Sequence, residues 1–252
     1  MPAPSLQTSD LTIRFGGHAA VNGVSCAFVP GELTAIVGPN GAGKTTWFNL
    51  VSGQLTPTEG RIFLEGNDVT GLAPSARAKA GIGRAFQLTN LFPKLSVIEN
   101  VRLAVQARHG AGGRFLSRPA ARLRDEAEIY VERVRLTSMA HLPAAALPHG
   151  DQRKLEVALL LAMEPKVFMF DEPTAGMSVD EAPVILDLIA EIRKDASKTI
   201  LLVEHKMDVV RALADRIVVL HNGELVADGL PDVVMALPVV REIYLGVGAE
   251  AA

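Results

Sequence analysis

The segment Gly38–Thr45 reads GPNGAGKT and matches the pattern G-x-x-x-x-G-K-[ST]. It follows the apolar run Glu32–Val37, which predicts a strand buried on both faces, and it overlaps the start of a helical pattern over Lys44–Ser52. In such a turn the backbone N–H groups point inward around phosphate oxygens, and the helix N-terminus adds partial positive charge. We expect Lys44 to reach the β- and γ-phosphates of a nucleotide and the Thr45 hydroxyl to bind Mg²⁺. The alternative is a glycine-rich turn that fits the pattern without a ligand. The residues predicted to contact the nucleotide here are Gly38, Pro39, Asn40, Gly41, Ala42, Gly43, Lys44, Thr45 and Thr46.

A second apolar run, VFMFDE, ends in the two carboxylates of Asp171 and Glu172. A carboxylate at the end of a buried strand can hold magnesium through water, and Glu172 can polarise a water for in-line attack on the γ-phosphate. The alternative is that the pair caps a helix N-terminus. Beside the phosphate-binding turn, the two carboxylates predict a domain that binds and hydrolyses a nucleoside triphosphate.

The order of these motifs resembles that of the nucleotide-binding subunits of ABC transporters, and the resemblance covers nearly the whole chain. It implies that Phe15 stacks on the adenine of ATP, and that Gln87 touches Mg²⁺ and faces a membrane subunit. It also implies that His205 contacts the γ-phosphate, although a histidine at a strand end is by itself more often structural. The segment Leu147–Ala158 stands in the place of the family's signature motif, where Gly150 would meet the nucleotide. On this resemblance the cofactors are ATP and Mg²⁺, the catalytic residues are Glu172 and His205, and the metal site is formed by Thr45, Gln87 and Asp171.

The chain departs from the family at two loops. The signature, usually Leu-Ser-Gly-Gly-Gln, reads LPHGD over 147–151, and the D-loop, usually Ser-Ala-Leu-Asp, reads AGMS over 175–178. In the family's dimer both loops meet the nucleotide of the opposite subunit. Pro148 supplies neither a hydroxyl nor an N–H, and Asp151 adds a negative charge near a helix start. We therefore expect low ATPase activity from a homodimer, which a sibling subunit with an intact signature would remedy.

Finer resemblance points to the first ATP-binding subunit of importers of branched-chain amino acids. It is carried by FGGHAAVNGVS, HGDQRKLEVA, DEPTAGMS and VVREIYLG. The implied partners are integral-membrane permease subunits and a second ATP-binding subunit, identical or not, at the cytoplasmic face of the inner (plasma) membrane. The nearest alternatives are urea/amide importers and the lipopolysaccharide-exporting ATPase.

Two interpretations from other functional classes stay open. One is a soluble P-loop ATPase acting on a cytosolic partner, and the other is a regulatory module that binds ATP without hydrolysing it. The segment after Gln87 discriminates the first from a transporter subunit. Leu91, Phe92, Leu95 and Val97 would form an exposed apolar groove if a membrane subunit docks there, and would be buried otherwise.

Strand patterns that alternate with helical patterns predict an α/β fold with a mostly parallel sheet. We expect one ABC-type ATPase domain over 1–252, with an N-terminal antiparallel β part, a core formed by 1–87 and 165–252, and an inserted helical subdomain over 88–164. The expected strands are Leu11–Phe15, Val24–Val29, Glu32–Val37, Arg61–Gly66, Ile82–Gln87, Val167–Phe170, Thr199–Glu204, Arg216–His221 and Glu224–Ala227. The expected helices are Lys44–Ser52, Ile98–Arg108, Ala120–Leu136, Pro183–Lys194 and Met207–Ala214, and Asn222-Gly223 is the expected hairpin turn.

Composition narrows the possible classes of protein. The formal net charge of −3, from 25 basic and 28 acidic residues, argues against nucleic acid as a partner. The one cysteine, Cys26, allows no internal disulfide, and we expect it and Trp47 in the core. The longest apolar run, Val157–Met163, is far shorter than the ~20 residues of a bilayer span, and the N-terminal residues do not resemble a signal peptide. We expect a chain that does not cross a membrane.

Overall fold

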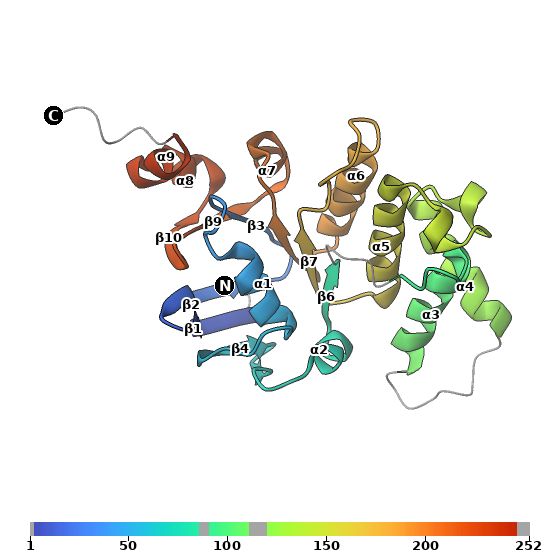
Figure 1. Cartoon of the computed structure of the whole chain (residues 1–252), viewed down its shortest axis with the longest axis horizontal. Coiled ribbons are helices and arrows are strands. Elements are labelled where there is room, and N and C mark those ends of the chain that lie inside the picture. The colour runs from blue at the N-terminus through green and yellow to red at the C-terminus, as the bar shows by residue number, and fades with distance from the viewer. Residues whose placement is uncertain (1–2, 86–90, 111–119, 246–252) are drawn as a thin grey trace.

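The computed structural model describes residues 3–85, 91–110 and 120–245, and it contains two sheets (Figure 1). The first is antiparallel, with the strand order β2-β1-β4-β5. Its strands are β1 (Leu6–Phe15), β2 (His18–Phe28), β4 (Glu59–Leu64) and β5 (Asn67–Asp68). This confirms the predicted N-terminal antiparallel part, although β1 and β2 begin several residues before the expected strands.

The second sheet has six strands in the order β10-β9-β3-β8-β7-β6. They are β3 (Leu33–Val37), β6 (Ile82–Ala85), β7 (Val167–Asp171), β8 (Thr199–Val203), β9 (Arg216–His221) and β10 (Glu224–Gly229). All neighbours pair in parallel except β9 and β10. Every residue of β3, β7 and β8 is buried, which is the arrangement that continuous apolar runs indicate. The carboxyl ends of these three strands lie side by side, so the loops that follow them meet.

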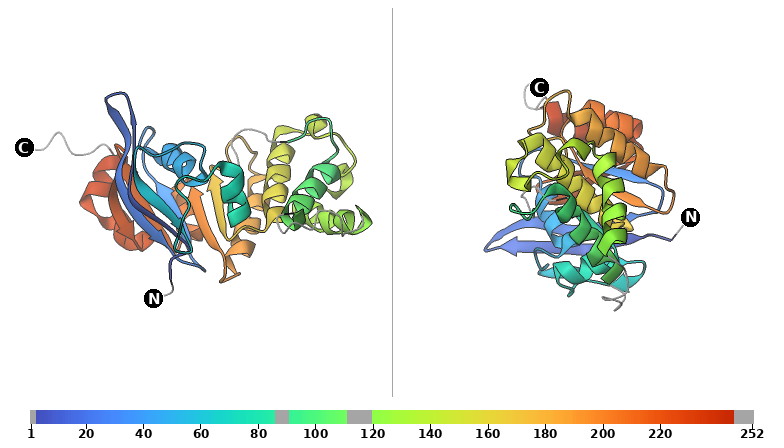
Figure 2. Two further views of the ribbon diagram at one scale, coloured as in Figure 1. Left: turned by 90° about the horizontal axis from the view of Figure 1, so that it is seen from below. Right: turned by 90° about the vertical axis from the view of Figure 1, so that its right-hand side faces the viewer.

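Helices flank both sheets and lie at both ends of the molecule. They are α1 (Lys44–Ser52), α2 (Pro74–Ala80), α3 (Val97–Gly110), α4 (Ala120–Arg133), α5 (His149–Met163), α6 (Ala182–Arg193), α7 (Met207–Leu213), α8 (Pro231–Ala236) and α9 (Pro238–Leu245). Helices α3, α4 and α5 form the helical subdomain at the end away from α8 and α9, as the views in Figures 1 and 2 agree. Within the described ranges, no helix combines the length and apolar character that a bilayer crossing needs.

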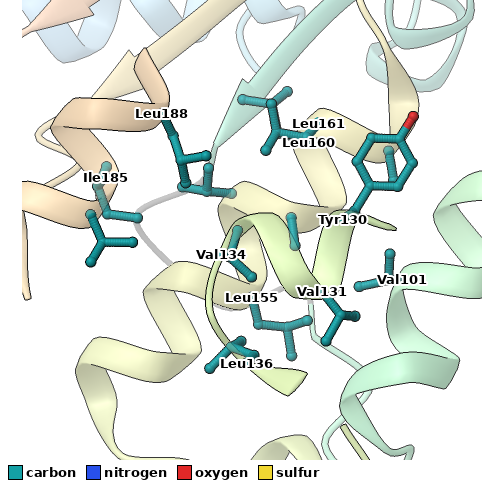
Figure 3. Close-up of a cluster of buried hydrophobic side chains, with 14 of the residues drawn as sticks. Val101, Tyr130, Val131, Val134, Leu136, Leu155, Leu160, Leu161, Ile185 and Leu188 are labelled. Atoms are coloured by element: carbon teal, nitrogen blue, oxygen red, sulfur yellow. The ribbon is translucent and has the colours of Figure 1, made fainter. Parts of the chain in front are cut away.

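Clusters of buried apolar side chains pack the helices and the two sheets against one another. One cluster fills the helical subdomain and continues onto the large sheet, and Figure 3 shows Val101, Val131 and Leu155 of α3, α4 and α5 turned toward one another. A second cluster lies between the antiparallel sheet, α1 and the large sheet. Trp47 and Cys26 belong to it, and Trp47 packs edge-on against Phe28 at a ring distance of 5.6 Å. The prediction that both residues are core is confirmed.

The structure corrects the sequence analysis in several places. Helix α4 ends at Arg133, not at Leu136, because Arg135 adopts a left-handed φ of 58° that no helix can continue through. Helices α2, α8 and α9 were not predicted, and α5 was expected only as a helix start near Asp151. Val97 is fully buried at the start of α3, so it is not part of an exposed groove. Leu91 is half-buried against the helical core, whereas Phe92 and Leu95 are exposed.

Candidate nucleotide-binding and hydrolytic site

A polar cavity of about 200 Å³ opens where the loop after β3 meets the loops after β7 and β8. Its lining residues are Ala20, Asn40, Gly41, Ala42, Gly43, Lys44, Thr45, Thr46, Glu172 and His205. The parallel strands therefore bring the predicted phosphate-binding turn, Glu172 and His205 to one place, although these residues are far apart in the sequence.

Close backbone contacts explain why glycines stand in this turn. A Cβ on Gly38 would overlap the carbonyl oxygen of Leu220, and one on Gly43 would overlap that of Ala20. Both glycines also have a positive φ, and Gly43 is the N-cap of α1 without any side-chain cap. The first N–H groups of α1 are thus left to an anion at the positive end of the helix dipole.

Lys44 is the buried cation of the site, with 6% of its surface exposed. Its Nζ donates hydrogen bonds to the carbonyl oxygens of Gly38 and Pro39, at 2.7 and 2.9 Å. Burial lowers the pKa of the Lys44 ammonium, and the charges of Glu172 and Asp171 partly offset that effect. Its two acceptors are neutral carbonyls, so phosphate oxygens can replace them at an electrostatic advantage.

Glu172 and His205 form a pair across the cavity. The Nε2 of His205 lies 2.7 Å from Oε1 of Glu172, and the imidazole donates this bond because a carboxylate can only accept. Glu172 has a left-handed φ of 49°, while its N–H still donates to the carbonyl oxygen of Val203 at the end of β8. A non-glycine residue in this region is strained, and such strain gathers at functional sites. The arrangement can orient a water and move a proton next to bound phosphate.

Asp171 is the last residue of β7 and its side chain is completely buried. Its Oδ2 accepts a hydrogen bond of 2.7 Å from Arg84, and its Oδ1 has no partner among the described residues. Burial raises the pKa of this carboxyl, and the Arg84 guanidinium counteracts that rise. An orphaned carboxylate oxygen beside a phosphate-binding turn suits Mg²⁺, a hard cation that prefers oxygen ligands. The residues present therefore fit a magnesium ion held by Thr45, Asp171 and nucleotide phosphates.

Among the described residues, five predicted site residues do not line this cavity: Phe15, Gly38, Pro39, Gly150 and Asp171. Gln87 falls outside the described residues. Phe15 is 52% exposed at the end of β1, in the hairpin whose second strand carries Ala20. Gly150 lies in the first turn of α5, where a Cβ would overlap the carboxylate of Glu181. The predicted roles of these residues stay predictions.

Sequence reasoning missed three residues that support the site. Glu204, buried after β8, accepts hydrogen bonds from the Thr174 hydroxyl and from the backbone N–H of His205, at 2.8 and 2.7 Å. Arg84 holds Asp171, as described above. Tyr244 of α9 lies against the Gly38 backbone, and its burial raises the pKa of its hydroxyl to about 12. No local pattern marks these residues, except that the polar Glu204 directly follows a fully buried strand.

Comparison with known proteins agrees with this geometry. The family model for ABC transporters matches residues 21–175. The high-affinity branched-chain amino acid transport ATP-binding protein LivG of Escherichia coli is 39% identical over 253 residues, which covers 98% of this chain and 99% of the relative. The corresponding protein BraF of Pseudomonas aeruginosa is 39% identical over 254 residues, with the same coverage.

Solved structures of ATP-binding cassettes superpose on most of the chain. A nucleotide-free cassette from an ABC transporter has a TM-score of 0.82 and 28% identity, covering 96% of this chain and 98% of that one. A dimeric cassette in a post-hydrolysis state bound to ADP and Pi has a TM-score of 0.79 and 25% identity, with coverages of 90% and 98%. The chain belongs to the ABC transporter family, in which it is an ATP-binding subunit that hydrolyses ATP as part of a transporter complex.

Proposed function

We propose that this chain powers an importer of branched-chain amino acids from the cytoplasmic face of the inner membrane. The observation that carries the proposal is the similarity over full length to LivG and BraF, at 39% identity. The motifs that surround the nucleotide cavity, and not only the phosphate-binding turn, lie inside the matched region. A permease in the membrane would select the amino acid, and this subunit would supply the energy.

The cavity suggests how the subunit performs hydrolysis. Phosphates of ATP replace the carbonyl acceptors of Lys44 and take the free N–H groups at the start of α1. Thr45 and Asp171 would hold Mg²⁺, which neutralises charge on the transferred phosphoryl group. Glu172 accepts a proton from the attacking water, and His205 holds the Glu172 carboxylate in place and faces the γ-phosphate. Phe15 would stack on adenine, and Gln87 would complete the metal site.

The active form is proposed to be a dimer of ATP-binding subunits. Gly150 lies outside the cavity of its own subunit, on the first turn of α5. A second subunit placed against this helix start could present its nucleotide there, which is the role that the family resemblance assigns to the signature loop. The partner is this chain or a sibling.

We place the contact with the permease on the turn that carries Phe92 and Leu95. These side chains are 56% and 37% exposed. The turn is rigid, because the buried Asn100 side chain accepts a bond from the Phe92 N–H and donates to the carbonyl oxygens of Phe92, Leu95 and Ser96. A fixed pair of exposed apolar side chains suits an apolar helix segment of a membrane subunit.

Uptake measurements test the proposal. A strain that lacks this gene would receive either the native chain or the Glu172→Gln variant, and uptake of labelled leucine and of labelled urea would be followed. We expect the native chain, and not the variant, to restore leucine uptake alone. Restored urea uptake, or leucine uptake independent of the gene, would overturn the substrate assignment. The ATPase rate of the purified protein reports on hydrolysis separately.

A further inference from the structure

Arg84 connects three elements that meet beneath the phosphate-binding turn. It belongs to the edge strand β6, and only 5% of its side chain is exposed. Its Nη2 donates to Oδ2 of Asp171 at 2.7 Å. Its Nη1 donates to Oδ1 of Asn49 at 2.6 Å and to the Ser52 hydroxyl at 3.1 Å, both on α1.

The guanidinium is therefore fixed from both sides. Asn49 and Ser52 belong to the helix that begins at Lys44, and Phe48 of the same helix places its ring 5.6 Å from the guanidinium carbon. Bonds at two nitrogens and a ring against the planar group leave it little freedom to rotate. The carboxylate that Arg84 binds, that of Asp171, is therefore held in a fixed position relative to the phosphate-binding turn.

What Arg84 holds is one oxygen of Asp171 and not the other. A purely structural ion pair in a core gives little net stability, because both charges lose their hydration. A structural pair would also be expected to satisfy both carboxylate oxygens, yet Oδ1 of Asp171 is buried without a partner among the residues described. The bond to Oδ2 prevents the carboxylate from exchanging its oxygens, so Oδ1 is the atom left for a cation.

We propose that Arg84 is a positioning residue that orients Asp171 for Mg²⁺ at the nucleotide. The inference rests on the magnesium site of the proposed function and adds a residue that acts on the metal through Asp171. It requires that loss of Arg84 lowers the affinity for the metal ion. Binding of nucleotide without metal should stay nearly unchanged, because Arg84 does not line the nucleotide cavity.

Arg77 provides a matched control. It is even more buried, at 1% exposure, and it also contacts the end of α1 by donating to the carbonyl oxygens of Leu50 and Val51. Its other acceptors among the described residues are the carbonyl oxygens of Thr70 and Leu72, so that all four of these acceptors are neutral carbonyls. Its loss should reduce stability without changing the metal site.

The experiment measures two affinities of the full chain in the native form and in the variants Arg84→Met, Arg84→Lys and Arg77→Met. These are the affinity for ATP in EDTA, by calorimetry, and the affinity of the ATP complex for Mn²⁺, by electron paramagnetic resonance. For Arg84→Met we expect Mn²⁺ affinity to fall about tenfold or more, the loss of about one charge-assisted interaction, with metal-free ATP affinity within about threefold of native. Arg84→Lys should lose less Mn²⁺ affinity, since the lysine ammonium keeps the positive charge but not the planar set of N–H donors of the guanidinium. Arg77→Met should lower the melting temperature and keep native Mn²⁺ affinity.

Native Mn²⁺ affinity in Arg84→Met, or an equal loss in Arg77→Met, would overturn the role of Arg84. If Arg84→Met does not fold, the variant Asn49→Ala tests the proposal instead, because it removes one acceptor of the guanidinium and keeps the positive charge. Unchanged Mn²⁺ affinity in Asn49→Ala would also overturn the proposal. If the native chain binds ATP with no added affinity from Mn²⁺, the magnesium site of the proposed function has failed instead.

Discussion

Replacing Pro148 by serine should raise the ATPase activity of the purified dimer strongly and should change the stability of the subunit only slightly. Pro148 is the exposed N-cap residue of α5, with φ −54° and ψ 156°, and it makes no side-chain cap. Serine adopts these angles without strain. The new hydroxyl would stand one residue before His149 and two before Gly150, at the helix start that the facing nucleotide is expected to reach.

The effect of Pro148→Ser on stability should be smaller than its effect on closure of the dimer. A serine N-cap stabilises a helix by about 0.5–2 kcal/mol, and loss of the proline ring destabilises by about 0.4–1 kcal/mol through the unfolded chain. The net change in stability therefore lies between about −0.5 and +1.6 kcal/mol, which moves the melting temperature of a chain of this size by at most about 6 °C. A hydrogen bond to a charged phosphate contributes about 1.5–3 kcal/mol, which corresponds to an increase in dimer closure of about 10- to 150-fold.

Steady-state ATPase rates at several protein concentrations, with melting temperatures in parallel, distinguish the two effects. Pro143→Ser is the matched control, because Pro143 is also exposed, precedes a short helix (Ala144–Ala146) and has nearly the same φ, −58°. We expect the control to leave the rate unchanged. The reasoning is refuted if Pro148→Ser raises the rate by less than about threefold, or if Pro143→Ser raises it as much.

Four further predictions follow from the site and the core. Lys44→Ala should weaken ATP binding about 10²- to 10⁴-fold, because two charge-assisted bonds to phosphate of about 1.5–3 kcal/mol each are lost; an unchanged affinity in a calorimetric titration would exclude the phosphate-binding role of the Gly38–Thr45 turn. Glu172→Gln should keep ATP affinity and reduce turnover about 10²- to 10⁴-fold; turnover at the native rate would mean that the carboxylate is not the base. Phe92→Asp should release the protein from membranes that contain its permease, because a carboxylate in an apolar contact loses its hydration. Ile129→Asp, at a position of the helical subdomain with nearly the same exposure (57% against 56%), should not; equal release by both would contradict the docking surface. Cys26 should resist a thiol reagent at about pH 8 until the protein unfolds, since the thiolate is the reactive form. Burial raises the pKa of its thiol from 9.0 to about 12, and the free energy of unfolding should therefore fall as pH rises across that interval, where only the unfolded chain ionises. Rapid labelling of the folded protein would contradict this.

Local signals predicted the helix that follows the proposed phosphate-binding turn and the hairpin turn between β9 and β10. Helix α1 spans Lys44–Ser52 as expected, because glycines with positive φ, Gly43 and Gly53, stop the helix on both sides. The hairpin turn at Asn222-Gly223 was also predicted, since both residues adopt the positive φ that this dipeptide favours, 49° and 79°.

Contacts between distant segments could not be predicted in this way. Arg84 and Asp171 are 87 positions apart, and a lone arginine in a short apolar strand does not indicate which carboxylate it will meet. Val97 was expected in an exposed groove if a membrane subunit docks after Gln87, and buried otherwise. Its spacing to Val101 and Val105 is helical, and the three side chains pack together on the buried face of α3.

The geometry of α5 also separates the two departures in the signature loop, which appear equivalent in the sequence. Asp151 does not present a free charge, because its Oδ1 accepts a hydrogen bond of 2.7 Å from Lys154 one turn later, and both side chains are largely buried. A charge neutralised within its own helix has little effect on a phosphate in another subunit. Pro148, in contrast, is exposed and leaves the helix start without a cap. We therefore expect position 148, and not 151, to bear on the facing nucleotide, so that Asp151→Gln alone should leave the ATPase rate of the dimer near its native value.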